Sequence, residues 1–215
     1  INFKNYMEIS GGKTLELAKI AETISKSFKV EIILAPPQAS LFHITKSVKI
    51  PVISQHVDNE KVGSTTGFFI PELAKSYGVV GSLINHSEHR LDHKIIKPLV
   101  DRLRKLDMLS IVCASDALEV GMLSKFNPDM IAIEPPELIG TGQAVSKVNP
   151  AIIRDSVTEA KKYSELKVIC GAGIVDKSDV ISAIKLGSQG ILIASGIIKA
   201  RSWKEKLSEL VQAFT

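Results

Sequence analysis

The sequence has few aromatic residues, few cysteines and no long apolar run, and each shortage excludes a class of protein. Aromatic residues make up 5% of the 215 positions, so aliphatic side chains must form the core, as they do in parallel sheets. Two cysteines, Cys113 and Cys170, each end an apolar run, which predicts buried thiols in a reducing compartment rather than a disulfide framework. No apolar run reaches the length of a transmembrane helix, so we expect no membrane partner.

The sequence also lacks a concentration of charge and a recognisable leader. The formal net charge is +4, and the lysines are scattered, with Lys161-Lys162 among the few doublets. Nucleic-acid binders concentrate their positive charge, so we expect no nucleic-acid partner; an anionic small molecule is an equally suitable ligand. The chain begins directly on Ile1-Asn2-Phe3-Lys4 without a signal-peptide pattern, which predicts a cytoplasmic protein. Because it does not begin with Met, we expect that a few residues of the first strand precede Ile1.

Short β-branched runs alternate with longer amphipathic stretches along the whole chain. The apolar runs cover 30–34, 50–53, 79–84, 108–113, 130–133, 166–170 and 189–194, and residues 2–6 are the remnant of one more. The helical patterns include 14–27, 91–106, 150–164, 177–186 and 203–214. This alternation predicts an α/β fold with a parallel sheet, either a closed barrel or a doubly wound open sheet.

Eight strand–helix units favour the barrel, and no linker interrupts them, so we predict a single (β/α)₈ barrel domain over residues 1–215. Such barrels usually have about 250 residues, so some helices must be shortened here. The connections look shortest after the second, third and fifth strands.

Reactive residues follow several of the predicted strands, at the barrel end where such enzymes carry their chemistry. They are Asn2 and Lys4, Gln55-His56, Asn85-His86-Ser87-Glu88, Glu134, Gly171-Ala172-Gly173 and Ala194-Ser195-Gly196. The two small-residue turns offer exposed main-chain N–H groups, as in the phosphate sites of these barrels, although glycines after a strand also serve simply to make a turn. Glu134 is placed for proton transfer if its surroundings are dry, or for a cap or ion pair with a loop.

His86 follows a buried run, where an imidazole can polarise a carbonyl group. His89 and His93 follow at spacings of three and four, which on one helix face would resemble metal ligands. No cysteine or carboxylate has matching spacing, so we expect His89 and His93 to be surface residues and predict no metal. Residues 136–142 place Pro136 at one end and glycines at the other, the pattern of a loop that closes over a ligand or of an ordinary surface loop.

Together these segments resemble the triosephosphate isomerase family. Asn2-Phe3-Lys4 resembles its Asn-aromatic-Lys motif, and Asn85-His86-Ser87-Glu88-His89-Arg90 resembles its Gly-His-Ser-Glu-Arg-Arg signature. Glu134-Pro135-Pro136-Glu137-Leu138-Ile139-Gly140-Thr141-Gly142 resembles its lid, residues 63–67 its interdigitating loop, and the turns at 171–173 and 194–196 its phosphate-binding turns. The matches run in order from residue 2 to past residue 196, and the short chain and the Pro-Glu-Leu lid are similar to the archaeal branch.

The resemblance implies a TIM barrel that interconverts dihydroxyacetone phosphate and D-glyceraldehyde 3-phosphate through an enediolate, in glycolysis and gluconeogenesis, without a cofactor. It implies that Glu134 is the base, that His86 is a neutral electrophile and that Lys4 stabilises the developing negative charge. It further implies that Asn2 and Lys4 hold the substrate and that Glu88 pairs with Lys4 or with the interdigitating loop. The residues expected to bind the phosphate are Ile139, Gly173, Ala194, Ser195 and Gly196.

The sequence departs from the family pattern at three places. Asn85 replaces a common glycine, His89 replaces an arginine, and the lid has no tryptophan. The family is at least dimeric and its archaeal members tend to be tetramers, so we expect a homotetramer or homodimer. The alternatives are another sugar-phosphate barrel, which lacks His86 and Glu134 in these contexts, and a catalytically silent barrel that binds a sugar phosphate or a protein.

Overall fold

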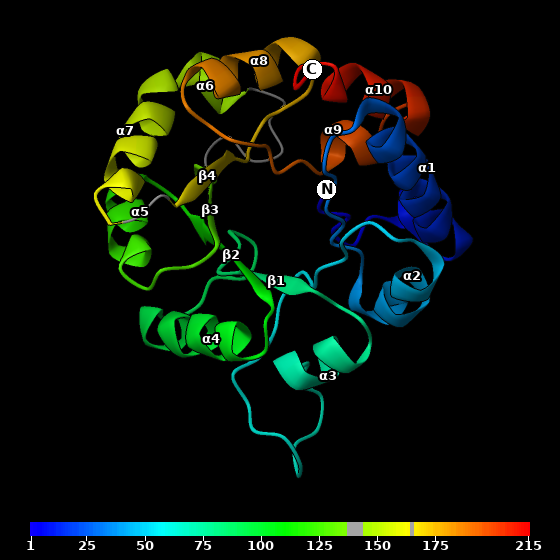
Figure 1. Cartoon of the computed structure of the whole chain (residues 1–215), viewed down its shortest axis with the longest axis vertical. Coiled ribbons are helices and arrows are strands. Elements are labelled where there is room, and N and C mark those ends of the chain that lie inside the picture. The colour runs from blue at the N-terminus through cyan, green and yellow to red at the C-terminus, as the bar shows by residue number, and fades with distance from the viewer. Residues whose placement is uncertain (137–143, 164–165) are drawn as a thin grey trace.

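The structure is a computed structural model that describes residues 1–136, 144–163 and 166–215, and it places strands inside a ring of helices (Figure 1). Four parallel strands pair in chain order, and they are β1 (Gly81–Ile84), β2 (Leu109–Ala114), β3 (Met130–Ile133) and β4 (Lys167–Cys170). Their side chains are almost all buried on both faces, as expected for parallel strands with helices on one side and other strands on the other.

Four further extended segments complete the ring through single parallel bridges. Asn2 pairs with Ala35, Leu34 with Val52, Ser54 with Ser82 and, beyond β4, Cys170 with Ile191. The circle closes where the Asn2 N–H donates to the Ile193 carbonyl over 2.8 Å. Hydrogen bonds therefore join all eight extended segments, and the fold is the predicted (β/α)₈ TIM barrel.

The helices range from 4 to 17 residues in length, and three of the short ones lie where the sequence predicted. The helices are α1 (Gly12–Phe28), α2 (Leu41–Ser47), α3 (Pro71–Ser76), α4 (His93–Lys105), α5 (Ala117–Ser124), α6 (Val145–Val148), α7 (Pro150–Lys161), α8 (Lys177–Lys185), α9 (Ser195–Ile198) and α10 (Trp203–Val211), with 3₁₀ turns η1 (Met7–Ile9) and η2 (Gln38–Ser40). Helices α2, α3 and α5, after the second, third and fifth strands, have 7, 6 and 8 residues against 17 in α1. The prediction of shortened helices is confirmed.

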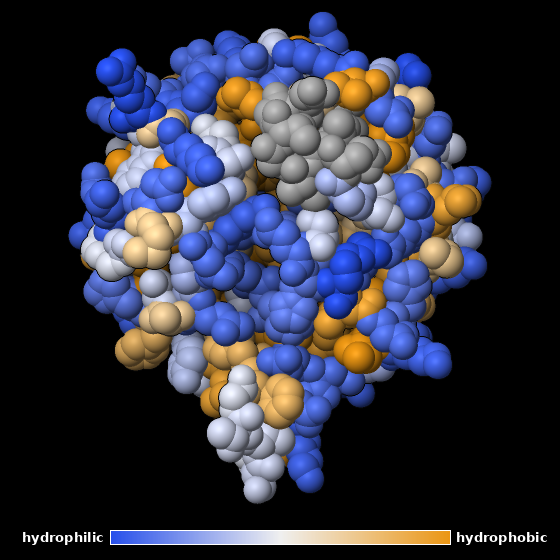
Figure 2. All heavy atoms as spheres, turned by 180° about the vertical axis from the view of Figure 1, so that it is seen from behind, coloured by the Kyte–Doolittle hydropathy of each residue, from blue (hydrophilic) through white to orange (hydrophobic). Residues whose placement is uncertain are grey.

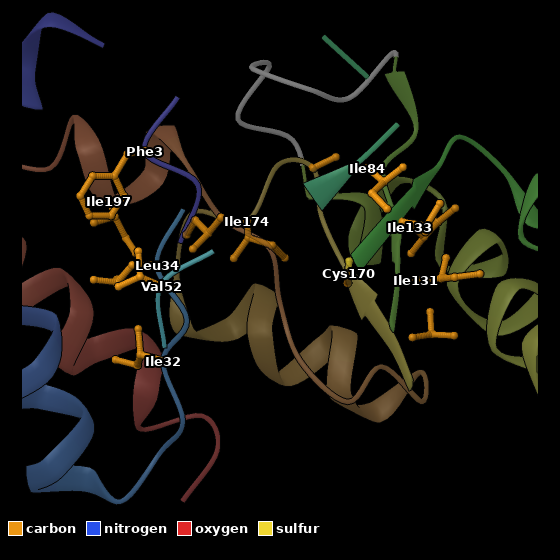
Figure 3. Packing of buried hydrophobic residues seen from close by; sticks show 14 of the residues in the cluster. Phe3, Ile32, Leu34, Val52, Ile84, Ile131, Ile133, Cys170, Ile174 and Ile197 are labelled. Carbon is orange, nitrogen blue, oxygen red and sulfur yellow. The ribbon is translucent and has the colours of Figure 1, made fainter. Parts of the chain in front are cut away.

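The period of two along each strand divides the core into two parts. Alternate residues form the filling of the barrel, namely Ala35, Ile53, Leu83, Ile111, Cys113, Ala132, Ile169 and Leu192. The intervening residues, such as Val52, Ile84 and Ile131, pack outward with the helices (Figure 3). Inward-facing positions just past the strand ends therefore reach the mouth of the barrel.

One predicted strand is shorter than expected. The sequence predicts a strand over residues 2–6, but the bridge involves only Asn2, because Lys4 has a φ of +49° and Tyr6 precedes the 3₁₀ turn at Met7–Ile9. The loop before α3, which contains Gly63 and Gly67, projects away from the body of the molecule (Figures 1 and 2). Among the described residues, no helix combines the length and apolarity needed to cross a membrane.

Candidate active site

Glu134 is a buried carboxylate at the mouth of the barrel. Ala132 points into the barrel, so two residues later the side chain of Glu134 continues that inward row, just past the end of β3. The residue is 6% exposed, and its Oε2 atom has no hydrogen-bond partner among the described residues. A buried carboxylate oxygen without a donor is costly, which is typical of a group that waits for a ligand or a proton.

His86 faces this carboxylate from the turn after β1. Its Nε2 atom lies 3.5 Å from Glu134 Oε2, and the imidazole is also buried. On the other side of the ring, Nδ1 accepts the Glu88 N–H over 3.2 Å. We therefore assign the proton of the neutral ring to Nε2, the atom that faces the pocket.

Asn2 and Lys4 come from the first extended segment and are held in place by a local turn. The Lys4 N–H donates to Asn2 Oδ1 over 3.0 Å, which stabilises the left-handed backbone at Lys4. Gln55 Nε2 donates to the Lys4 carbonyl over 3.0 Å, and Lys4 Nζ forms a 2.8 Å ion pair with the half-exposed Glu88. These contacts hold the ammonium group at the edge of the same pocket.

Two nitrogen donors converge beside Glu134. Asn2 Nδ2 lies 3.4 Å from His86 Nε2, and Asn2 Oδ1 is occupied by the Lys4 N–H. With a proton on Nε2, both nitrogens carry hydrogen and neither satisfies the other. An oxygen atom of a ligand placed between them would accept from both.

The turns after β4 and after the last extended segment form the other wall of the pocket. A single pocket is lined by Asn2, Lys4, His86, Glu134, Gly173, Ala194, Ser195 and Gly196, together with neighbouring backbone. Among the described residues, the N–H groups of Gly173, Ser195 and Gly196 have no protein acceptor. A Cβ on Gly196 would lie 2.6 Å from the Ile174 carbonyl, so only glycine allows the two turns to approach this closely. Free amides of this kind bind anions.

Gly171 has a different role from the one its position in the sequence indicated. The sequence favoured a glycine that lets the backbone approach an anion, but a Cβ on Gly171 would lie 2.5 Å from Glu134 Cγ. Gly171 therefore provides the space that the catalytic candidate occupies. This requirement follows from the neighbouring strand, so the sequence around Gly171 contains no signal for it.

Two buried thiols flank Glu134 and stay protonated. Burial raises the pKa of Cys113 well above its ordinary value, and the charge of Glu134 adds to the effect. Burial, followed by the charges of Glu134 and Asp179, raises the pKa of Cys170 to about 12. A protonated thiol is a poor nucleophile and a poor metal ligand, so both fill space beside the carboxylate, and Cys170 Sγ also donates to the Gly171 carbonyl over 3.6 Å.

The histidines that could have indicated a metal site are engaged elsewhere. The ring of His89 stacks on that of His56 with centroids 3.8 Å apart, and His93 Nε2 lies 3.0 Å from Glu119 Oε1. Residues 1–136, 144–163 and 166–215 contain no cluster of three or more His, Cys, Asp or Glu side chains arranged for a metal. A larger cavity of about 280 Å³ at the amino ends of the strands is mostly apolar and lies away from the candidate residues.

Two predictions fall outside the described residues. Ile139, a predicted phosphate ligand, and the loop tip that follows Pro136 lie within 137–143. The structure also gives roles to two residues beside the site. Gln55, which the sequence indicated only as a polar residue after the third strand, anchors Lys4, and Glu119, which the sequence did not indicate, contacts the turn that carries His86. The distance of Glu119 from the motifs in the sequence left no signal that could have identified it.

Comparison with known proteins agrees with this geometry. The triosephosphate isomerase family model matches residues 1–213. The triosephosphate isomerase of Cenarchaeum symbiosum is 46% identical over 215 residues, covering 100% of this chain and 96% of that protein. Those of Methanothermus fervidus and Methanocaldococcus jannaschii are each 42% identical, covering 98% and 99% of this chain and 96% and 97% of the two proteins. The chain, with its buried glutamate and histidine facing an anion pocket in a (β/α)₈ barrel, belongs to the triosephosphate isomerase family.

Proposed function

We propose that Glu134, His86 and Lys4 together interconvert dihydroxyacetone phosphate and D-glyceraldehyde 3-phosphate, the reaction of this family. Glu134 removes a proton from C1 of dihydroxyacetone phosphate, and the electrons of that C–H bond form the C1–C2 double bond of an enediolate. The negative charge then resides on the former carbonyl oxygen, where His86 Nε2–H and the Lys4 ammonium group stabilise it. After His86 has moved a proton between the two oxygens, Glu134 returns its proton to C2.

The reaction changes no overall oxidation state, since one carbon is reduced as its neighbour is oxidised. It therefore consumes no external electron donor or acceptor, which supports the prediction that no cofactor takes part. The arrangement requires one base that reaches both carbons and donors for both oxygens.

The observation that carries the proposal is the 3.5 Å approach of His86 Nε2 to the buried, unpaired Oε2 of Glu134 at the wall of an anion pocket. A purely structural carboxylate in this position would be expected to have a donor. A catalytic base instead needs an oxygen that is free to reach a carbon-bound proton.

The phosphate site of the proposal consists of the free amides at Gly173, Ser195 and Gly196, with Ala194 of the second turn also lining the pocket. Asn2 and Lys4 hold the reacting end, Glu88 orients Lys4, and Ile139 is proposed to add a main-chain contact to the phosphate. Inhibition by inorganic phosphate tests this part separately from the chemistry. A phosphate inhibition constant that is unaffected by Gly173→Ala and Ser195→Pro would contradict it.

A coupled assay tests the reaction itself. Glyceraldehyde 3-phosphate is supplied, and the dihydroxyacetone phosphate formed is reduced by an auxiliary dehydrogenase whose cofactor absorbance is followed. Rapid turnover supports the isomerase over a catalytically silent barrel. A folded wild-type protein without turnover would contradict the proposal.

We further propose that residues 1–215 form one domain that assembles into a homotetramer or homodimer. Val62 and Phe68 in the projecting loop are 64% and 47% exposed, and Leu118 and Met122 on the short helix α5 are 80% and 45% exposed. Apolar side chains that are this exposed are typical of surfaces that another molecule covers. Light scattering at micromolar concentration tests the assembly, and a monomer would contradict it.

We also propose that the enzyme acts in the cytoplasm, where glycolysis and gluconeogenesis exchange triose phosphates. The free, buried thiols of Cys113 and Cys170 fit a reducing compartment. Fractionation of the source cells tests the location.

A further inference from the structure

Outside the pocket, Glu119 is a second buried carboxylate with an unusual number of donors. It lies in the first turn of α5, after the N-cap Asp116, and its side chain is 4% exposed. One oxygen, Oε2, accepts the Ser115 N–H over 2.7 Å and the Ser115 hydroxyl over 2.9 Å. These two bonds would suffice for a local cap at the start of the helix.

The other oxygen of Glu119 reaches across to the turn after β1. Oε1 accepts from Arg90 Nη2, lies 3.0 Å from His93 Nε2 and accepts from Asn85 Nδ2 over 3.4 Å. Burial alone would raise the pKa of Glu119, but the bonds from Ser115, Arg90 and His93 outweigh it and hold the pKa at about 2. At neutral pH the side chain is therefore an anion, and several donors surround it.

Asn85 connects this anion to the candidate electrophile. It is fully buried, has a φ of +62° and directly precedes His86. Its Nδ2 donates to the Cys113 carbonyl over 3.0 Å, and its Oδ1 accepts the Leu91 N–H over 3.0 Å. The turn that contains His86 is thus closed by the Asn85 side chain.

Glu119 favours the same orientation of the Asn85 amide as the two hydrogen bonds between that amide and backbone groups do. An amide oxygen turned toward the carboxylate would be repelled, whereas the NH₂ group is attracted. The same carboxylate holds Arg90, whose Nη1 donates to the Asn85 carbonyl over 3.4 Å. Glu119 therefore restrains both the side chain and the backbone of the residue before His86.

We propose that Glu119 is a positioning residue that holds the Asn85–Arg90 turn so that His86 Nε2 faces Glu134. This proposal rests on the proposed role of His86 as the electrophile. Glu119 lines none of the pocket that contains the anion-binding turns, so its effect should fall on the chemical step rather than on phosphate binding.

The test is the variant Glu119→Gln, which keeps the shape but loses the charge. We expect kcat to fall about tenfold, since small displacements of a catalytic group are costly, while KM and inhibition by inorganic phosphate stay within about twofold. Rates are corrected for the folded fraction measured by circular dichroism. An unchanged kcat in the folded variant would overturn the proposal.

Asp129→Asn is the matched control. Asp129 Oδ2 also accepts the N–H and hydroxyl of a serine, each over 2.8 Å, but this serine is Ser110, which lies within β2 at its amino end. We expect this variant to lose some stability and to keep its kcat. A loss of kcat equal to that of Glu119→Gln would mean that the effect is general destabilisation and would overturn the proposal.

The path through Asn85 is tested by a double-mutant cycle. Asn85→Gly keeps a residue that adopts positive φ easily but removes the amide. If Glu119 acts through this amide, kcat falls in Asn85→Gly and Glu119→Gln lowers it little further in that background. Fully multiplicative effects would contradict the path. Should Glu119→Gln fail to fold, Asn85→Gly and Arg90→Gln test the link from the donor side, and normal kcat in both would overturn it.

Nitrogen NMR of ¹⁵N-histidine-labelled protein gives a readout independent of activity. The His86 signals are assigned by their loss in His86→Gln. We expect the Nε2-protonated tautomer in the wild type and in Asp129→Asn, and a mixture of tautomers in Glu119→Gln. An unchanged spectrum in Glu119→Gln would contradict the positioning role of Glu119. An inactive wild type would contradict the proposed function, and the NMR result alone would then test whether Glu119 positions His86.

Discussion

At each end of strand β2, a serine donates its N–H and hydroxyl to a nearby carboxylate. The carboxylate at the carboxyl end also contacts the turn that contains His86. At the amino end, Ser110 donates its N–H and hydroxyl to the exposed Asp129, which returns its own N–H to the Ser110 hydroxyl over 3.1 Å. At the carboxyl end, Ser115 donates the same two groups to Glu119, whose second oxygen continues to Asn85 and Arg90. Equivalent hydrogen bonds thus close a strand end at one side of the barrel and support the candidate catalytic turn at the other.

The largest expected effect is at the carboxyl end. We expect Glu134→Asp and His86→Gln each to lower kcat by about two to four orders of magnitude, because a positioned acid or base contributes about that much. The midpoint of thermal unfolding should stay close to that of the wild type, since neither side chain holds the core together. Steady-state assays and circular dichroism measure the two quantities, and a near-native rate in either variant would remove that residue from its role.

Substitution of two glycines, one at each end of the barrel, allows the two ends to be compared directly. Gly171→Ala would place a Cβ 2.5 Å from Glu134 Cγ, so we expect the base to move and kcat to fall about tenfold to a hundredfold with the fold retained. Gly81→Ala would place a Cβ 2.6 Å from the Leu109 carbonyl, which is backbone and cannot move aside. We expect it to lose about 1–3 kcal/mol of stability while the folded fraction keeps its kcat. Denaturant titration measures the stability of both variants, and steady-state kinetics measures their kcat. A loss of kcat in folded Gly81→Ala, together with a loss of stability alone in Gly171→Ala, would refute the comparison.

The pH dependence of stability separates Glu119 from the other carboxylates. Its pKa is about 2 in the folded state against an ordinary value of 4.5, so its stabilisation is present above pH 4.5 and is lost as the pH falls toward 2. In Glu119→Gln, we expect the unfolding free energy to fall over this pH range by a few kcal/mol less than in the wild type. Denaturant titrations from pH 2 to 6 measure the difference between wild type and variant, in which all other carboxylates cancel. Parallel curves would show that Glu119 is not the linked group.

The smallest effect is expected at the amino end. Asp129→Asn should cost about 1 kcal/mol, because the amide oxygen still accepts from Ser110 while the charge-assisted component is lost. Its pH–rate profile should match that of the wild type. A shifted profile would mean that the two ends of β2 are not independent.

Much of this barrel follows from the sequence because the alternation of β-branched runs with amphipathic stretches, and the position of a residue after such a run, are local properties. They predicted the parallel strands, the shortened helices and the place of Glu134 at a strand end. The first strand was predicted too long because a left-handed turn at Lys4, stabilised by the Asn2 side chain, ends it early. Because this turn depends on a polar side chain, the pattern of apolar residues in the sequence did not indicate it.

The supporting contacts could not be predicted because they join residues that are distant in the sequence. Glu119 has the appearance of an ordinary first-turn acid, and only the packing of α5 beside the turn after β1 brings it to Asn85 and Arg90. Gly171 similarly has the pattern of an anion-binding turn, while the structure requires its missing side chain for Glu134. In both cases the partner lies on a neighbouring unit of the barrel.

Isomerisation in deuterated water tests the central claim most directly. Dihydroxyacetone phosphate is converted in D₂O, and the glyceraldehyde 3-phosphate formed is trapped and examined by proton NMR. A base at Glu134 that exchanges its proton with solvent predicts deuterium at C2 of the product of the wild type, and loss of both turnover and label in Glu134→Gln. Turnover and labelling that persist in a folded Glu134→Gln would contradict the account.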